Sequence, residues 1–431
     1  MSPEIIGLIG IILMLVFLFI RMWIGLAMGI VGFLGCAYLA GTDQALAVLG
    51  NTPYDTISSY VISAVPLFIL MGMVIAETQI GADLYNTAYK FVGQLRGGLA
   101  MATVLACAAL AAITGLSAPA LVAMGKIALP EMKKYGYDDQ LATGSIACAG
   151  TLAILIPPSL GFILYGILTE QSVGKLFMAG MLPGILLTFL FIVTIMIITA
   201  RRPDAGPPGP KTGFKEKIFS LKNTWPMLAL FLLVIGGIYG GIFTPTEAGA
   251  VGAFGAIVIT LASRRLTTKN LLDSLRETAV TTAMVMLLFI GAFLFMRFLA
   301  ISKLPFLLGG LVAGLTLSKY VILAAIIVLY IILGMFLDIM SAIMLTVPIL
   351  YPAIIAMGFN PIWYGVIMVL VMEMGLVTPP VGLTVFALAG VTDVPTGTVF
   401  RGILPFVVAM IVCVVLLTVF PEIALFIPSL M

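Results

Sequence analysis

Apolar runs of about 20 residues recur along the whole chain, and this is the length that a helix needs to cross roughly 30 Å of hydrocarbon. Short polar segments separate these runs. The runs cover residues 5–20, 23–40, 57–76, 176–200, 225–243, 248–263, 279–298 and 403–420. Because a helix satisfies its own backbone hydrogen bonds inside lipid, the pattern predicts an all-α polytopic membrane protein.

Four further apolar stretches are interrupted, and they form two kinds of element. Two stretches, at about 98–130 and 320–352, contain breaks at 114–120 and 337–342, and we expect re-entrant helical hairpins there. The two others, at about 139–168 and 361–392, contain the sequences GTLAILIPPSLG and GLVTPPVG, and we expect broken membrane-spanning helices. Interrupted backbone persists inside a membrane where it lines a cavity.

The spacing of prolines and glycines repeats along the chain. A shift of 222 residues places Pro130 on Pro352, Pro157-Pro158 on Pro379-Pro380, and Pro183 on Pro405. We therefore predict a first repeat at 1–200, a basic cytoplasmic linker rich in proline and glycine at 201–223, and a second repeat at 224–431.

The charges predict that the two repeats have opposite orientations in the membrane. When Arg21 is placed inside and the spans alternate, the first hairpin dips in from the cytoplasm and the second from outside. Of the 21 Lys and Arg residues, four then lie outside, namely Lys175, Arg297, Lys303 and Lys319. This excess of basic residues inside follows the usual bias of membrane proteins, and inverted repeats are typical of secondary transporters. Two stretches with mixed apolar and charged residues, 82–95 and 268–277, predict helices lying at the interface.

Composition narrows the classes of function. The chain is 62% hydrophobic and 9% charged, so a lipid bilayer is its expected surrounding. The absence of histidine excludes a histidine proton relay or a histidine metal site, and the four cysteines lie in apolar stretches. The chain carries no nucleotide-binding glycine loop and no arrangement of nucleophile and base. We expect neither an enzyme nor a nucleic-acid-binding protein.

The breaks carry the candidate chemistry. Proline has no amide hydrogen, so each Pro-Pro pair leaves backbone carbonyls of the preceding turn without a partner. These carbonyls and the nearby hydroxyl groups of Ser117, Thr151, Ser341 and Thr378 are hard oxygen ligands suited to sodium. The helices that start after the breaks direct the positive ends of their dipoles to the same place, which suits a carboxylate.

Few ionisable residues are predicted at membrane depth. Asp338 and Glu373 are the leading candidates, because such residues are functional hypotheses by default. For Glu247, at the start of a helix, capping is the favoured interpretation. Lys126 is expected to extend to the cytoplasm, with contact to substrate as the less favoured alternative.

Five sequence motifs are distinctive, namely Gly150-Thr-Leu-Ala-Ile-Leu-Ile-Pro-Pro-Ser159, Gly180-Met-Leu-Pro-Gly184, Phe243-Thr-Pro-Thr-Glu-Ala248, Phe336-Leu-Asp338 and Gly375-Leu-Val-Thr-Pro-Pro-Val-Gly382. Together they resemble the large membrane subunit of tripartite ATP-independent periplasmic (TRAP) transporters, over essentially the whole chain.

The resemblance implies a sodium-driven uptake system of a bacterial inner membrane with an elevator mechanism. A small four-helix membrane subunit, which is not fused to this chain, and a soluble periplasmic substrate-binding protein are the implied partners. The implied cargo is a small organic acid, such as a C4-dicarboxylate, sialic acid or a related carboxylate.

The resemblance also implies site residues by position. One sodium site would comprise Ser117, Gly150 and Thr151, and the other Ser341, Gly375 and Thr378. The predicted substrate contacts are Ser117, Pro119, Pro158, Ser159, Asp338 and Pro380. The first hairpin tip departs from the Gly-Ser-Ser common in the family, because it reads Gly115-Leu116-Ser117 and has one hydroxyl group fewer.

Three other classes fit less well. A one-component sodium/dicarboxylate symporter usually has Ser-Asn-Thr at its hairpin tips, and neither tip has that sequence. A proton-pumping subunit of a respiratory complex needs ionisable residues along its helices, which are nearly absent. A membrane-embedded enzyme needs convergent nucleophiles or paired acids.

Overall fold

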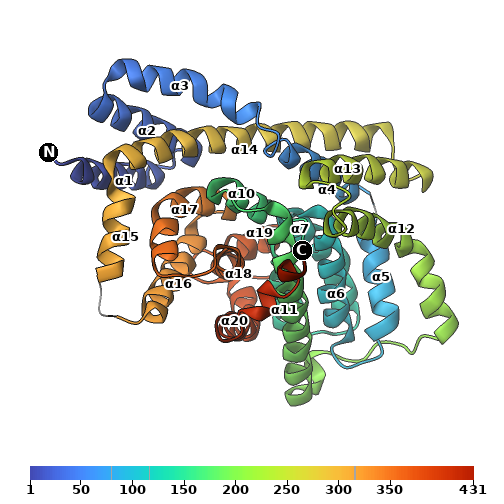
Figure 1. Ribbon diagram of the computed structural model, residues 1–431. Helices are drawn as coiled ribbons and strands as arrows, with labels where there is room; N and C mark the ends of the chain where they lie inside the picture. The colour runs from blue at the N-terminus through green and yellow to red at the C-terminus, as the bar shows by residue number, and fades with distance from the viewer. Residues whose placement is uncertain (79, 116, 315–316) are drawn as a thin grey trace.

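The computed structural model describes residues 1–78, 80–115, 117–314 and 317–431, and all regular structure in those residues is helical. Seven helices are long and apolar enough to cross a membrane, or up to nine when two bent pairs are each counted as one span. The prediction of an all-α polytopic membrane protein is confirmed. In Figure 1, α14 (Thr268–Ser302) runs along one edge of the molecule, and the hairpins and broken helices lie together below it.

The helices of the first half follow one another through short connections. They are α1 (Pro3–Phe19), α2 (Ile24–Ala40), α3 (Thr42–Ile57), α4 (Ala64–Ala76), α5 (Ile80–Val92), α6 (Gly98–Thr114), α7 (Ser117–Lys134), α8 (Asp139–Gly150), α9 (Leu152–Leu155), α10 (Leu160–Thr169) and α11 (Val173–Arg201). The pair α6 and α7 occupies the segment expected to form the first hairpin. The segment expected to form the first broken helix contains α8, α9 and α10.

The second half begins after the short helix η1 (Pro203–Ala205). Its helices are α12 (Phe214–Tyr239), α13 (Pro245–Ala262), α14, α15 (Leu304–Gly314), α16 (Lys319–Phe336), α17 (Ile339–Ala356), α18 (Pro361–Val377), α19 (Leu383–Val391), α20 (Thr396–Val419), α21 (Glu422–Leu425) and η2 (Pro428–Leu430). Shifting the bounds of α7 by 222 residues gives 339–356, the bounds of α17. The division into two inverted repeats stays a prediction.

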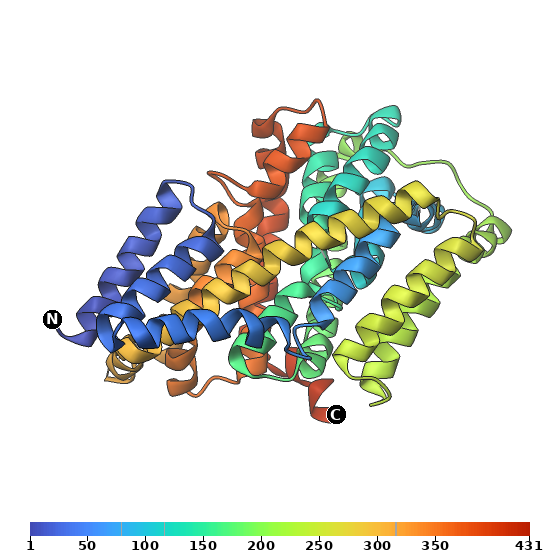
Figure 2. The same ribbon diagram turned by 90° about the horizontal axis from the view of Figure 1, so that it is seen from above.

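Several boundaries differ from those expected. The predicted interfacial helix at 268–277 is wrong as a separate element, because α14 runs without interruption for 35 residues from Thr268. No proline or glycine lies between Thr268 and Gly291 to end the helix. Similarly, α12 begins at Phe214, inside the expected linker. The helices α3 and α15 were not expected, and Figure 2 shows α3 (blue) running crosswise to α1 and α2.

The first broken helix and α18 occupy the centre of the molecule, whereas Pro379 and Pro380 of the second break are exposed. In the span 139–169, 94% of the most apolar window is buried, whereas the figure for α16 is 22%. A central position surrounded by protein is where a membrane protein tolerates interrupted backbone. The helix α16, an arm of the second hairpin, and the long helix α14 therefore lie farther out, whereas α6 of the first hairpin is buried.

Close backbone contact joins α2 to α14. A Cβ atom built on Gly291 would lie 1.9 Å from the carbonyl oxygen of Gly25, and one built on Gly32 would lie 2.6 Å from the backbone of Leu294. Small residues allow such close approach, which drives helix association in membranes. Figure 2 shows α14 (yellow) crossing the molecule diagonally.

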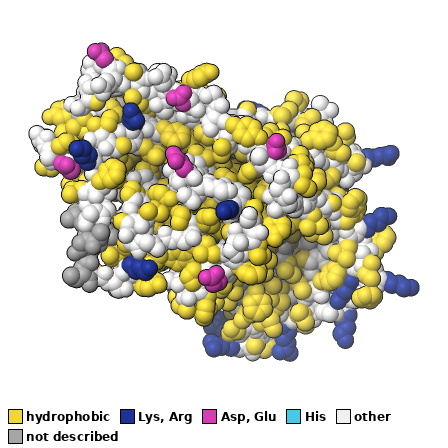
Figure 3. Space-filling model, viewed as in Figure 1, with side chains coloured by type: hydrophobic (Ala, Val, Ile, Leu, Met, Phe, Trp, Pro, Cys, Tyr) yellow, Lys and Arg dark blue, Asp and Glu magenta, His cyan; other side chains and the backbone are white. Residues whose placement is uncertain are grey.

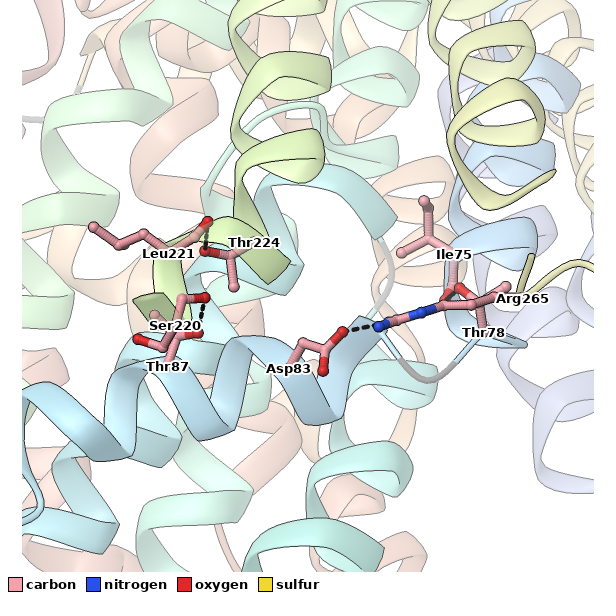
Figure 4. A network of polar contacts seen from close by, with 8 residues as sticks. All are labelled: Ile75, Thr78, Asp83, Thr87, Ser220, Leu221, Thr224 and Arg265. Atoms are coloured by element: carbon pink, nitrogen blue, oxygen red, sulfur yellow. Dashed lines mark hydrogen bonds and ion pairs between the residues drawn. The ribbon is translucent and has the colours of Figure 1, made fainter. Parts of the chain in front are cut away.

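Lys and Arg side chains gather along one edge of the molecule in Figure 3, where Figure 1 places α5, α11 and α12. Figure 4 shows polar contacts that tie α5 to the second half in this region. Arg265, after α13, pairs with Asp83 in α5, and the Thr87 hydroxyl group donates to the Ser220 carbonyl oxygen at 3.2 Å. Thus α5, which leads into the first hairpin, is fastened to α12 and to the α13–α14 turn.

We expect Arg265→Ala to lower the free energy of unfolding by about 1 kcal/mol, because the Arg265 and Asp83 side chains are 33% and 18% exposed and water screens them only partly. Thermal unfolding of the purified protein in detergent measures this loss. The control is Lys134→Ala, which removes a more exposed pair with Glu131, 68% and 46% exposed at 3.8 Å. Equal destabilisation by both variants would contradict a role for the α5 contact.

Candidate transport site

The tip of the first hairpin rests against the first broken helix. Gly115 follows α6 with a φ of +61°, and a Cβ atom built on it would lie 2.7 Å from the carbonyl oxygen of Pro158. Any larger residue would therefore meet both an unfavourable backbone conformation and a steric clash. Farther along this hairpin, Leu121 packs on Gly150, where an added Cβ atom would lie 3.2 Å from the Leu121 Cβ.

The first break lies between α9 and α10. Pro157 and Pro158, joined by a cis peptide bond, supply no amide hydrogen to the carbonyl groups four residues earlier, those of Ala153 and Ile154. Ser159 caps α10, because its Oγ accepts a hydrogen bond from the Phe162 amide at 3.4 Å. The break thus leaves two carbonyl groups without the usual helical amide donor, while the next helix still starts with a cap.

The second hairpin has a polar tip built from two of the predicted site residues. Asp338 is the N-cap of α17, and its Oδ2 accepts from the Ser341 amide at 3.2 Å. The Ser341 hydroxyl group donates to Oδ1 of the same carboxylate. The structure therefore brings Asp338 and Ser341 together, with the carboxylate at the positive end of the helix.

The second break, between α18 and α19, differs from the first. The carbonyl oxygen of Gly375 accepts from the Thr378 amide at 3.0 Å, and that of Leu376 accepts from the Thr384 hydroxyl group at 2.9 Å. These two carbonyls are the ones that Pro379 and Pro380 cannot serve. In the first break the residue corresponding to Thr384 is Phe162, which has no hydroxyl group.

The remaining predicted residues take other positions at these breaks. Thr151 and Thr378 each donate to a carbonyl oxygen of the preceding turn, at 2.6 Å to Cys148 and 2.5 Å to Met374. Gly375 packs on the second hairpin, since a Cβ atom there would lie 2.7 Å from the Cα of Gly334. Pro380 forms the second Pro-Pro pair with Pro379, again with a cis bond. The Pro119 side chain lies outside the described part of the structure.

One hydrogen bond joins the two halves at the first hairpin tip. The Ser117 hydroxyl group donates to Oε1 of Glu373 in α18 at 2.9 Å, across 256 residues of sequence. Both side chains are buried, and Glu373 is 1% exposed. The sequence marked both residues as candidates, but nothing in it indicated that they are partners.

Two cavities lie beside the hairpin tips. The cavity at the second tip has a volume of about 550 Å³, and Arg21, Trp23, Asp338, Ser341 and Leu383 contribute to its lining. The cavity at the first tip has a volume of about 450 Å³, with Thr114 and Lys126 in its lining. Both volumes fall in the range of small-molecule sites, and each cavity is lined by one basic and one acidic side chain, Arg21 with Asp338 and Lys126 with Glu77.

The donor set at the tips fits sodium. It consists of oxygen atoms from hydroxyl groups, backbone carbonyls and one buried carboxylate, and hard cations prefer such ligands over nitrogen or sulfur. Within the described residues, Oε2 of Glu373 is buried without a hydrogen-bond partner. That oxygen is available to a cation. The division of these residues between sodium and substrate stays a prediction.

Comparison of the sequence with known proteins also indicates a transporter. The family described as tripartite ATP-independent periplasmic transporter, DctM component, matches residues 11–423. The C4-dicarboxylate TRAP transporter large permease protein DctM of Pseudomonas aeruginosa is 36% identical over 400 residues, which cover 90% of this chain and 93% of that protein.

Two further similarities are informative. The isethionate TRAP transporter permease protein DctMQ of Oleidesulfovibrio alaskensis is 33% identical over 420 residues, 95% of this chain but 64% of that protein. Among solved structures, MtrF of Neisseria gonorrhoeae superposes with a TM-score of 0.56 at 12% identity, over 99% of this chain and 95% of that one. This last similarity concerns the fold alone.

Proposed function

This chain belongs to the DctM component family of tripartite ATP-independent periplasmic transporters, as a multi-pass bacterial inner-membrane permease and not an enzyme, and from that premise we propose that it couples sodium entry to the uptake of a small organic acid. The observation that carries the proposal is the contact of each hairpin with an interrupted helix, through Gly115 on Pro158 in the first half and Gly334 on Gly375 in the second. Such arrangements hold ions and anionic substrates at midmembrane in secondary transporters.

The proposed substrates are C4-dicarboxylates, sialic acid or related carboxylates. The relatives described above are named for a C4-dicarboxylate and for isethionate, both small organic anions. Arg21 and Lys126, each in the lining of one cavity, supply positive charge that suits such anions. We propose substrate contacts at Ser117, Pro119, Pro158, Ser159, Asp338 and Pro380, where the helix dipoles add to this charge.

We propose two protein partners, a small four-helix membrane subunit and a soluble periplasmic binding protein that delivers the substrate. The relative whose name joins M and Q is longer than this chain, which covers 64% of it. The additional length in that protein is compatible with a fused small subunit. We propose that the small subunit packs against the membrane helices of this chain.

We further propose an elevator mechanism. The moving unit would comprise the two hairpins and the two broken helices, and the static scaffold would include α2 and α14. Close glycine contacts lock α2 to α14, as expected for a static pair. The arm α5 joins α4 to the first hairpin, at the boundary between the two proposed units.

Thr378→Ala and Ser341→Ala test the sodium proposal. Each removes a hydroxyl group beside a break, and we expect the sodium concentration for half-maximal uptake to rise about tenfold, because a lost ligand costs on the order of 1.4 kcal/mol. The measurement is substrate uptake into proteoliposomes that contain the variant and its partner proteins, over a series of sodium concentrations.

The matched control is Thr418→Ala. Its hydroxyl group makes the same kind of bond to the preceding turn, at 2.8 Å to Val414, but it lies in α20 away from the tips. Thermal unfolding of all three variants separates effects on folding from effects on ion binding. An unchanged sodium dependence of uptake in both Thr378→Ala and Ser341→Ala would refute the assignment of these residues as sodium ligands.

A further inference from the structure

Glu373 is a buried carboxyl group that hydrogen bonding satisfies only in part. It lies in α18 with 1% of its surface exposed. Oε1 accepts from the Ser117 hydroxyl group at 2.9 Å, whereas Oε2 has no hydrogen-bond partner among the described residues. A buried carboxylate is costly unless a partner compensates its charge. The Oε2 atom of Glu373 is therefore able to accept a further ligand.

No basic side chain supplies that compensation. In the part of the chain that the structure describes, the ion pairs are Lys134 with Glu131 and Arg265 with Asp83, so no Lys or Arg nitrogen lies within 4.0 Å of Glu373. The Ser117 hydroxyl group, at the first residue of α7, lies at the positive end of an 18-residue helix. The partial positive charge at this helix end stabilises the Glu373 carboxylate. It does not occupy Oε2, which is able to bind a cation.

The first break lies next to this carboxylate. The short helix α9 contacts both α7, which carries Ser117, and α18, which carries Glu373. Two residues of α9, Ala153 and Ile154, have the carbonyl groups that Pro157 and Pro158 cannot serve. The three helices that carry this carboxylate, this hydroxyl group and these carbonyl groups are thus in mutual contact.

The second half has no equivalent of this arrangement. The shift of 222 residues places Glu373 on Thr151 and Ser117 on Ile339. The freed carbonyl of Leu376 in the second break already accepts from Thr384. The first hairpin tip therefore has a buried carboxylate oxygen without a hydrogen-bond partner among the described residues, whereas the carboxylate at the second tip, Asp338, is exposed and accepts from Ser341.

From these contacts we infer that Glu373, a residue of the second half, is a ligand of a sodium ion held at the first hairpin tip, with Oε2 completing a site formed by Ser117 and carbonyl oxygens of the first break. The inference rests on the proposed sodium coupling and extends it. Sodium bound here links α7 of one half to α18 of the other, so occupancy of the site holds the first hairpin against the second broken helix.

Sodium binding to the purified protein tests the inference without transport. The thermal midpoint of unfolding in detergent is measured over a series of NaCl concentrations, with choline chloride keeping the ionic strength constant and KCl as the comparison ion. Glu373→Gln keeps the size of the side chain and an acceptor for Ser117 but removes the charge. We expect it to require at least about tenfold more sodium for the same stabilisation.

The control is Met368→Leu, a volume-conserving change of a fully buried residue in the same helix, which should leave the sodium dependence as it is in the native protein. If the native protein responds to sodium and Glu373→Gln responds identically, the role of Glu373 is overturned while sodium coupling stands. If the native protein shows no stabilisation specific to sodium, both proposals fall.

Chemical labelling of the native protein covers the case in which Glu373→Gln does not fold. A hydrophobic carbodiimide converts a buried carboxyl group to an N-acylurea, which mass spectrometry locates in the sequence. We expect sodium to reduce labelling at Glu373 several-fold, and potassium at the same concentration to have no effect. Equal labelling of Glu373 in sodium and in potassium would overturn the inference.

Discussion

Reversal of the sodium gradient across proteoliposomes should abolish net uptake of substrate, and removal of ATP should leave uptake unchanged. If each transported anion travels with sodium, a tenfold gradient supplies about 1.4 kcal/mol for each ion, equivalent to about tenfold accumulation. The expected change is thus from concentration of the substrate inside the vesicles to its loss. The assay requires the permease, its small membrane subunit and the loaded binding protein.

Two controls make this experiment decisive. A potassium gradient of the same size, in the absence of sodium, should drive no accumulation above equilibrium. Clamping the membrane potential to zero separates the chemical gradient of sodium from its charge. Accumulation that proceeds at the same rate in potassium would exclude sodium as the coupling ion.

Gly291→Val should produce the largest loss of stability among the substitutions considered. A Cβ atom at this position would lie 1.9 Å from the carbonyl oxygen of Gly25, which is backbone and has no rotamer to change. The helices α2 and α14 would have to separate, with the loss of the contact at Gly32 as well. Overpacking of this kind costs about 1–3 kcal/mol and occasionally more, and backbone contact on both sides places this site at the upper end.

The control for this variant is Gly236→Val in α12, where an added Cβ atom meets nothing within 4 Å. We expect a lowered midpoint of thermal unfolding and a lower yield of folded protein for Gly291→Val alone. Equal effects of the two variants would mean that the helix propensity of valine, and not the contact between α2 and α14, sets the outcome.

The apolar runs and the positions of glycine and proline predicted most of the fold. The hairpin segment at 98–130 and the broken segment at 139–168 are recognisable because breakers interrupt otherwise apolar sequence, and helices end at these breakers. The arm α3 was missed since its sequence mixes polar and apolar residues and includes Gly50 and Pro53, which are typical of a loop. Position in the fold, not local propensity, determines that it is helical.

The site residues were predictable as individuals, but their partners were not. Glu373 was noticeable as a rare acid within an apolar run, and Ser117 as a hydroxyl group at a break. Their hydrogen bond spans 256 residues, a separation at which spacing carries no information. The two breaks differ because the Thr384 hydroxyl group donates a hydrogen bond to the carbonyl oxygen of Leu376, eight residues earlier. Only the folded chain shows that relation.

The uninterrupted length of α14 has a consequence for the surrounding lipid. Its 35 residues extend over about 52 Å at 1.5 Å for each residue, well beyond the roughly 30 Å of a hydrocarbon layer. Such a helix inclines to the membrane normal or extends into the aqueous phase, and inclination enlarges its projection on the membrane plane. In a thicker bilayer the tilt angle of α14 would decrease and its projection would become smaller. The length of the lipid acyl chains therefore affects the orientation of this helix.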